Sequence, residues 1–314
     1  MQLQQLDYVL AVVDEGSFTA AARSRGVTQP SLSQGVRALE AELGVDLFVR
    51  AGRPVRLTAA GEAFVVPARR AVRDAATARE AVAEVVGLAA GRLDLVCLPS
   101  IAADPVAVLV GRFRRAHPGV RVRITEPEDP DALVDEVRTG ASELGFAQLP
   151  VGEDLEVVPL ESHDYVAIVP PGGGDAGPLP LAALADAALV TTPPGTSTRR
   201  LVDEALAAAG VRPTIAVETD HREAMAPLVV AGAGVALLPR RLAGAAEAQG
   251  AVVREITPAI RREVGIVHRP GPLSPAARAF LALAAPASSP PPASRPAARR
   301  RGPVRRSAPP GRRP

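Results

Sequence analysis

The sequence predicts a mixed chain in which a small all-α domain precedes a larger α/β domain. Three helix-like segments lie within residues 1–58, and apolar strands alternate with helices from about residue 92 to 285. A long alanine-rich helical stretch over residues 59–90 joins the two regions. The 314 residues also favour about two domains. We therefore expect domains at 1–58 and 91–285, joined by the helix over 59–90.

The first two helices have simple patterns. Apolar residues at helical spacing predict a first helix that packs behind the other two: Leu3, Leu6, Leu10 and Val13. A second helix is expected from about Phe18 to Arg25, where Ala20, Ala21 and Ala22 leave room for a neighbouring helix. Gly26 then supplies a sharp turn.

The next helix carries the polar face of interest. Thr28 or Gln29 is expected to cap it, and Pro30 fits its first turn because that N–H needs no partner. One stripe is apolar and predicted buried: Leu32, Val36, Leu39 and Leu43. The opposite face then carries Ser33, Gln34 and Arg37, which suit base edges and phosphates in a major groove. This arrangement predicts a helix-turn-helix.

A short β-ribbon is expected directly after this helix. Residues 47–50 and 55–57 are β-type runs around the turn at 51–54. The ribbon would form a wing with three arginines available to phosphates or a minor groove: Arg50, Arg53 and Arg56. The alternative is a small helical subdomain whose arginines are merely solvated. Turn, capped helix and arginine-bearing wing in this order favour DNA binding.

The N-terminal region closely resembles the LysR-type transcriptional regulators. The matching residues are Phe18, Ala21, Ala22, Gln29, Pro30, Ser31, Ser33, Leu39, Glu40, Leu43, Gly44, Leu47, Phe48, Arg50, Leu57, Thr58 and Gly61. Gly35 departs from the family pattern, and we expect it to remove one DNA-facing side chain. With the resemblance, the residues expected to contact DNA are Gln29, Pro30, Ser31, Ser33, Gln34, Arg37, Arg50 and Arg53.

The helix over 59–90 has the pattern of a coiled-coil seam. Small and apolar residues alternate spacings of four and three along it: Phe64, Ala68, Ala71, Ala75, Ala78, Val82, Val85 and Ala89. We favour dimerisation through this seam, since readers of DNA half-sites usually bind as dimers. The alternative is an amphipathic helix packed on its own domain. Pro67 is expected to kink the helix, and Gly87 and Gly91 mark a hinge at its end.

The region after this hinge has a β-α rhythm. Strands are expected at 93–98, 120–125, 144–147, 165–169, 189–192, 214–217, 235–238 and 264–268. Helices are expected at 106–116, 132–138, 197–209, 223–230 and 275–284. Sheets of this kind bind ligands at the carboxyl ends of their strands.

This region is similar, more loosely, to the effector-binding domain of the same family, which is built like periplasmic solute-binding proteins. The matching stretches are residues 113–118, 229–239 and 274–278. The resemblance implies two α/β subdomains, the first over about 92–163 and 267–285, the second between them, with a cleft where they meet. It also implies a homodimer or homotetramer that binds double-stranded promoter DNA.

Three loops are candidates for binding a small-molecule effector. They span 99–102, 191–198 and 219–222, and each follows a strand and precedes a helix. Their hydroxyls and free helix-end N–H groups suit a carboxylate, so we expect an anionic effector. The candidate contacts are Ser100, Ile101, Thr192, Thr196, Ser197 and His221. The alternative for each loop is ordinary helix capping.

Enzymatic chemistry finds little support in the sequence. The four histidines show no metal-ligand spacing, residues 195–197 lack the second glycine of a nucleophile elbow, and no dinucleotide or phosphate-binding loop is present. We expect no cofactor and no catalytic residue. Cys97 lies in an apolar run and reads as a packed core thiol. The competing interpretation is a metabolite-binding α/β protein or enzyme with an incidental helical domain.

Composition indicates a cytoplasmic protein, since no apolar run could span a membrane and no basic-then-apolar leader is present. The net charge of +2 hides an asymmetry, because residues 286–314 carry eight arginines and no acid, which leaves the rest net negative. This tail cannot bury a core and is expected to be disordered. It is either a functionless extension or a DNA-contacting arm.

Overall fold

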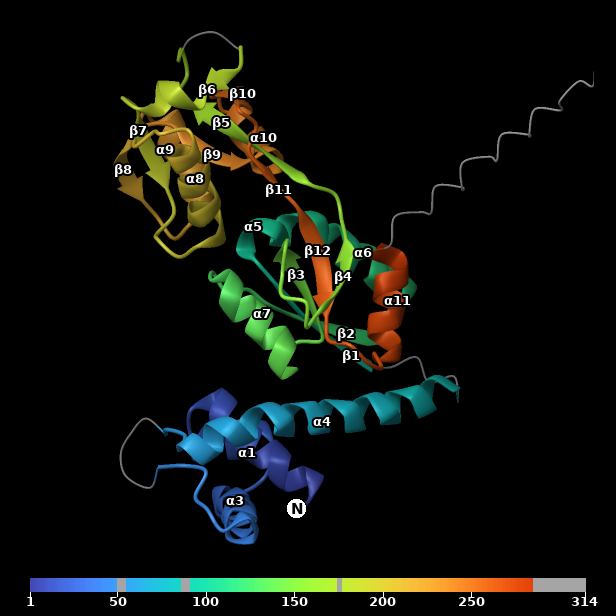
Figure 1. The fold of residues 1–314 in the computed structure, drawn as a ribbon. Coiled ribbons are helices and arrows are strands. Elements are labelled where there is room, and N and C mark those ends of the chain that lie inside the picture. The colour runs from blue at the N-terminus through green and yellow to red at the C-terminus, as the bar shows by residue number, and fades with distance from the viewer. Residues whose placement is uncertain (50–54, 86–90, 174–176, 285–314) are drawn as a thin grey trace, which may run out of the picture.

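The computed structural model describes residues 1–49, 55–85, 91–173 and 177–284. Figure 1 shows three tiers, with the N-terminal helices at the bottom and two α/β units stacked above them. The long helix α4 (Ala59–Val85) lies between the bottom and middle tiers. The expected order of an all-α region, a long helix and an α/β region is confirmed.

The first three helices form a small bundle. They are α1 (Leu3–Glu15), α2 (Phe18–Ser24) and α3 (Gln29–Leu43). The Thr28 hydroxyl caps α3 by accepting from the Ser31 N–H, with Pro30 in the first turn. The turn before α3 uses Gly26 at a φ of +66°, which an L side chain rarely adopts. A common core joins the three helices: Tyr8, Val9, Ala11, Val12, Ala21, Ala22, Leu32, Val36 and Leu39.

Two details of α3 differ from the sequence prediction. Leu43 was expected in the buried stripe but is 40% exposed, because it lies in the last turn, beyond the core that holds Leu39. Gly35 lies against α1 rather than on the open face of α3. A Cβ at Gly35 would lie 2.7 Å from Cδ2 of Tyr8, so this position faces α1, and the ring of Tyr8 fills the space.

The expected ribbon is present at its base. Phe48 and Leu57 form an antiparallel bridge, and the Val49 N–H donates to the Arg56 carbonyl at 2.9 Å. An edge-to-face contact between the rings of Phe18 and Phe48, with centroids 5.3 Å apart, holds the base of the ribbon against α2. The tip of the ribbon, with Arg50 and Arg53, lies outside the described residues.

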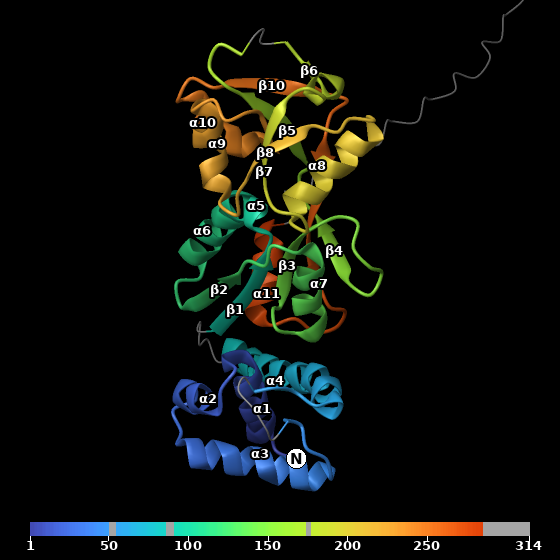
Figure 2. The same ribbon diagram turned by 90° about the vertical axis from the view of Figure 1, so that its left-hand side faces the viewer.

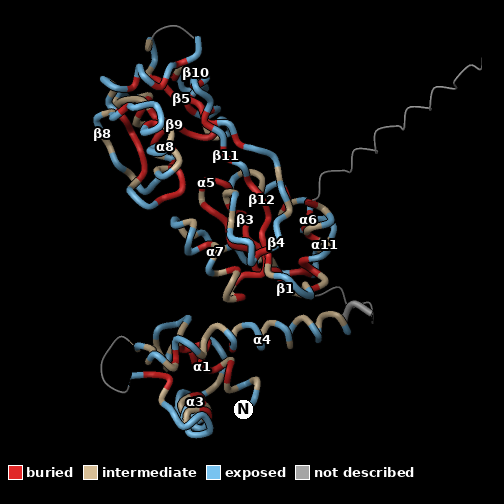
Figure 3. Tube along the Cα trace, in the orientation of Figure 1, coloured by how far each residue is buried: buried red, intermediate tan, exposed pale blue. Residues whose placement is uncertain are grey.

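Helix α4 has two different environments along its length. At its start, Phe64 and Ala68 pack on Leu6 and Leu10 of α1, so this part is an ordinary helix packed on its own domain. The helix continues through Pro67 without ending there. Farther along, the described part of α4 is exposed or half-buried (Figure 3). In the predicted seam, Val82 is 66% exposed. The side chain of Val85 and residues 86–90, including Gly87 and Ala89, lie outside the described residues.

The first α/β unit is built on a five-stranded sheet in the order β2-β1-β3-β12-β4. Its strands are β1 (Gly91–Cys97), β2 (Val120–Thr125), β3 (Leu144–Gln148), β4 (Glu156–Pro159) and β12 (Val264–His268). β2, β1 and β3 pair in parallel, whereas β12 runs antiparallel to both β3 and β4. Its helices are α5 (Pro99–Ile101), η1 (Ala102–Val106), α6 (Ala107–Ala116), α7 (Pro130–Thr139) and α11 (Pro275–Ala284).

The second unit contains two sheets. β5 (His163–Val169) is central to the first, between β10 (Val252–Thr257) and β9 (Ala236–Pro239). The short strands β6 (Leu179–Pro180) and β11 (Arg261–Arg262) extend it. The second sheet pairs β7 (Ala188–Thr191) in parallel with β8 (Thr214–Glu218). The helical elements are η2 (Leu181–Leu184), α8 (Ser197–Ala208), α9 (Arg222–Val230) and α10 (Arg240–Glu247).

Two chain crossings connect the units, one between β4 and β5 and one between β11 and β12. Figure 2 shows α7 and α8 stacked on one side, and α6, α9 and α10 on the other. All eight predicted strands are present; β4, β6, β10, β11 and α10 were not predicted. In β4 three of the four residues are exposed, so its sequence carries no apolar alternation to detect.

Candidate functional site

The exposed face of α3 carries the polar residues expected to contact DNA. Gln29, Gln34 and Arg37 are exposed and Ser33 is half-buried. The Gln29 amide donates to the Ser33 hydroxyl at 2.9 Å, so these two side chains are already oriented side by side on one face. Pro30 and Ser31 are also exposed in the first turn, where the Ser31 hydroxyl lies 2.8 Å from that of Thr28.

A surface hollow of about 680 Å³ lies between α3 and the base of the ribbon. It is lined by Phe18, Gln29, Ser33, Val36, Arg37, Glu40, Phe48, Val49 and Val55. Glu40 has a structural role there, because its carboxylate accepts from the N–H groups of Leu47 and Phe48 at 2.8 and 3.3 Å. The hollow thus places polar groups of α3 beside the base of the ribbon.

The two α/β units meet at a pair of serines. Ser100 lies in α5, just after β1, and Ser197 begins α8, shortly after β7. Both side chains are buried, and their hydroxyl oxygens lie 3.4 Å apart across the boundary. The structure therefore brings together two of the predicted effector contacts, each at the carboxyl end of a strand.

The other predicted contacts of these loops have different roles. Thr196 caps α8 by accepting from the Arg199 N–H at 3.3 Å, and its hydroxyl donates to the Pro193 carbonyl. The Thr192 hydroxyl lies 2.7 Å from that of Thr196. Both threonines thus shape the start of α8 from behind Ser197. Ile101 packs in the core of the first unit, and its N–H donates to the Leu98 carbonyl, which leaves its side chain no surface for a ligand.

His221 is exposed and lines a separate, adjoining cavity of about 660 Å³. The cavity lies between α5 and η1 of the first unit and α9 and α10 of the second, and Pro99 and Ala102 connect it to the Ser100 loop. Its walls include four acids: Glu126, Glu128, Asp220 and Glu223. Arg222 in the same wall forms a bidentate ion pair with Glu128, in which its two terminal nitrogens donate to the two carboxylate oxygens at 2.9 and 2.6 Å.

Arg262 is a buried residue of this site that the sequence interpretation missed. It is 1% exposed, and its guanidinium donates to the Ser100 hydroxyl at 2.8 Å and to the Ser100 carbonyl at 3.4 Å. The guanidinium also lies over the ring of Tyr165, 5.5 Å from its centroid. The sequence pattern could have revealed it. Ile260, Arg262 and Val264 occupy alternate, inward-facing positions, and an arginine is unusual at such a position.

Burial shifts the titration of nearby groups. Burial, followed by repulsion from Arg262, lowers the pKa of His163, against a smaller opposing effect of Glu161. Burial also lowers the pKa of Arg262 itself. Cys97 behaves as the predicted core thiol, since burial raises its pKa to about 12 and leaves it protonated and unreactive.

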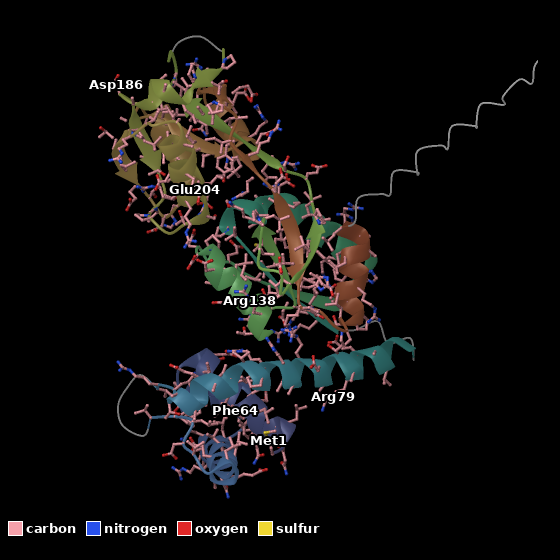
Figure 4. All side chains as sticks on the ribbon, in the orientation of Figure 1. Met1, Phe64, Arg79, Arg138, Asp186 and Glu204 are labelled. Carbon is pink, nitrogen blue, oxygen red and sulfur yellow. The ribbon has the colours of Figure 1, made fainter. Side chains whose placement is uncertain are left out.

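Helix α7 connects the cleft to α4. At its first turn, Asp129 and Asp131 accept from Arg200 of α8 at 2.8 and 3.1 Å. At its other end, the Arg138 carbonyl accepts from Arg70 of α4 at 2.9 Å. Figure 4 labels Arg138 at this end of α7, directly above α4. One ten-residue helix therefore contacts the second α/β unit and the long helix at opposite ends.

Comparison with protein families gives two matches. Residues 3–62 match the family described as bacterial regulatory helix-turn-helix protein, lysR family. Residues 86–288 match the LysR substrate binding domain. Among the described residues, no helix is long and apolar enough to cross a membrane.

Similar proteins and structures agree with these matches. The HTH-type transcriptional regulator IlvR of Caulobacter vibrioides is 32% identical over 90% of this chain and 97% of its own length. The HTH-type transcriptional regulator ShiR of Corynebacterium glutamicum is 33% identical over 76% of this chain and 82% of its own length. A full-length OxyR variant from Pseudomonas aeruginosa matches with a TM-score of 0.73 and 29% identity over 90% and 93% of the two chains. Full-length CbnR in complex with its target DNA matches with a TM-score of 0.63 and 26% identity over 90% and 99%.

Proposed function

Since the chain belongs to the LysR family of transcriptional regulators, we propose that α3 reads promoter DNA and that a small anion in the cleft changes how tightly it binds. The family and its relatives are regulators, which sets aside the enzyme interpretation. The chain carries a helix-turn-helix DNA-binding domain and an effector-binding domain. We assign DNA reading to residues 1–58, dimerisation to 59–90 and effector binding to 91–285.

The proposed DNA contacts come from one face of α3 and from the wing. Ser33, Gln34 and Arg37 would reach base edges in a major groove, because the buried stripe through Leu32 and Leu39 fixes the other face inward. In the first turn, Gln29, Pro30 and Ser31 would lie against the DNA backbone. Arg50 and Arg53 on the wing would contact phosphates or the adjacent minor groove.

The proposed effector site is the meeting point of Ser100 and Ser197. The observation that carries it is their contact across the boundary, 3.4 Å between two buried hydroxyls from different α/β units. The first turn of α8, which begins at Ser197, presents free N–H groups and the positive end of the helix dipole. Such a site favours a small anion. Thr192 and Thr196 would hold this turn in place, and His221 would face ligand atoms in the adjoining cavity.

We propose that the protein works as a homodimer or homotetramer in the cytoplasm. The supporting observation is the outer half of the α4 seam, where Ala71, Ala78 and Val82 are exposed in the monomer. Burial of an apolar stripe against a second copy would stabilise the pair of helices. A dimer would present two α3 helices to two half-sites.

We propose that effector binding is coupled to DNA binding through a change in the relative positions of the two α/β units. An effector can shift DNA binding only if its affinity differs between two arrangements of the protein. Helix α7 contacts both Arg200 beside the cleft and Arg70 on α4, so it would transmit a change at the cleft to the helix that carries the DNA-reading domain.

Calorimetry and DNA binding together test this function. Candidate effectors are small acids processed by the products of neighbouring genes, titrated into the wild type and the Ser100→Ala and Thr196→Ala variants. We expect weaker effector binding in both variants, with promoter affinity unchanged in the absence of effector. Effector affinity equal to that of the wild type in both variants would place the site elsewhere.

A further inference from the structure

The arginines around the cleft divide into two groups. Most of them have carboxylate partners, whether exposed or, like Arg222, buried: Arg199 pairs with Asp203 and Glu218, Arg200 with Asp129 and Asp131, Arg222 with Glu128, Arg241 with Asp104 and Glu161, and Arg261 with Asp164. Among the described residues, Arg262 has no carboxylate within 4 Å, although it is the most deeply buried of them. A buried charge without a counter-charge is unfavourable, so an unpaired arginine at this place calls for an anion.

Buried polar atoms without a hydrogen-bond partner lie on both sides of this arginine's surroundings. Among the described residues they are Nε of Arg262, Nε of Arg222, the hydroxyl of Tyr165 and the hydroxyl of Thr198. Tyr165 lies against the guanidinium, and Thr198 follows Ser197 in the first turn of α8. Buried polar groups are almost always paired in folded proteins, and exceptions often mark a site that a ligand completes.

We propose that Arg262 is the counter-charge for one carboxylate of the effector, which it holds together with Ser100 and Ser197. This inference rests on the proposed function of the cleft. The terminal nitrogens of Arg262 already donate to Ser100, so the edge that carries Nε is the one left for the carboxylate. A carboxylate seated there would accept from Nε and from the serine hydroxyls, in the charge-assisted geometry that arginine favours.

The charge around the site selects a single negative group rather than a dianion. The neighbouring His163 is buried, and its lowered pKa leaves it neutral at neutral pH. The adjoining cavity, into which the rest of the ligand would extend from the Pro99–Ala102 loop, has Glu126, Asp220 and Glu223 in its walls. A second negative charge would face these carboxylates, so the rest of the effector is uncharged or basic.

The test compares acids with their neutral counterparts by thermal unfolding and calorimetry. The probes are sodium acetate, butanoate and benzoate, set against acetamide, butanamide and benzamide, all at one ionic strength fixed with sodium chloride. In the wild type we expect stabilisation by at least one acid and by none of the amides. The Arg262→Met variant should lose this stabilisation, and its unliganded form should melt at a higher temperature than the wild type, because a buried unpaired charge is gone.

Two further variants keep the result interpretable. Arg262→Lys retains the positive charge but not the planar guanidinium with its Nε–H donor. It should fold normally and weaken acid binding at least tenfold. Arg261→Met, at the exposed neighbouring position, should bind acids as the wild type does. Promoter affinity without added acid should be the same in Arg261→Met as in the wild type.

The inference is overturned if the acids stabilise Arg262→Met as much as the wild type, if no acid gives a shift that its amide lacks, or if Arg262→Lys binds the acids with wild-type affinity. If the amides bind the wild type and this binding is lost in Ser100→Ala, the cleft is still the effector site, but the effector does not need a carboxylate. If the wild-type protein did not bind promoter DNA at all, the proposed function would be contradicted instead of this inference.

Discussion

The Nε atom of Arg73 on α4 lies 2.7 Å from the carbonyl oxygen of Gly140, the residue that ends α7. The same guanidinium donates to the Ala141 carbonyl at 3.0 Å and pairs with Asp94 at 3.3 Å and with Glu143 at 3.8 Å. Arg73 therefore fastens the helix next to the DNA-reading domain to the base of the effector-binding domain.

Replacing Arg73 by alanine should loosen this junction. Glu143 would be left buried without its cation, whereas Asp94 would keep its pair with Arg92 at 2.7 Å, so unfolding should become easier by about 1–3 kcal/mol. Amide hydrogen exchange should rise at residues 138–143 and leave the core of β5 unchanged. Arg79→Ala, at an exposed position of the same helix, is the matched control and should stay within about 0.5 kcal/mol of the wild type. Equal exchange rates in the two variants would contradict the junction.

Gly35 tests the close packing of α1 on α3. A helical alanine is favoured over glycine by about 0.5–1 kcal/mol, but an overpacked core costs about 1–3 kcal/mol. Since the added Cβ would meet the ring of Tyr8 at 2.7 Å, the steric cost should exceed the gain in helix propensity. Gly35→Ala should therefore lower the denaturant midpoint, and should raise it in a Tyr8→Ala background. A stabilised single variant would show that Tyr8 moves aside at no cost.

Much of the fold follows from local patterns. The caps, turns and apolar stripes of α1 to α3 were predicted because each is set by neighbouring residues, such as Thr28, Pro30 and Gly26. Six of the eight predicted strands have apolar runs that are largely buried, and the more exposed β2 and β8 were predicted because they are rich in β-branched residues. The edge strand β4 and the two-residue β11 were not, because they are defined by pairing partners that lie far away in the sequence.

The candidate site was predicted only in part, for a similar reason. Ser100 and Ser197 were selected because each begins a helix after a strand, which is a local signal. Arg262 belongs to a different strand, and its burial arises from the crossing of two chain segments between the units. Gly35 was assigned to the exposed face because its contact with Tyr8 depends on how closely α1 and α3 approach, which neighbouring residues in the sequence do not reveal.

The wing makes a separate prediction about salt. If Arg53 contacts a phosphate, Arg53→Ala should weaken binding to all DNA sequences alike, because phosphates carry no base information. The slope of log affinity against log salt should become shallower by about 0.9 for the lost contact. Fluorescence anisotropy between low and moderate salt measures both effects. A slope equal to that of the wild type would show that the wing does not touch DNA.

His163 predicts a dependence of stability on pH. Its pKa in the folded protein is lower than the value of 6.5 expected when unfolded, so the unfolded chain binds more protons in the range below pH 6.5. Stability from this residue is therefore complete above about pH 6.5 and declines as the pH falls toward the folded pKa. His163→Gln should reduce the loss of melting temperature between pH 7.5 and 5.5. An identical decline in both proteins would show that other groups account for it.

The central claim is that α3 reads promoter sequence, and one titration tests it most directly. Anisotropy of a labelled fragment from the region upstream of the gene, against a shuffled fragment of equal composition, should show clear preference for the upstream DNA. Ser33→Ala and Gln34→Ala should each weaken binding to that fragment roughly 5- to 30-fold, with little change for the shuffled one. The remote control Asp186→Asn should bind as the wild type does. Equal affinity of the wild type for both fragments, unchanged in both α3 variants, would contradict the account.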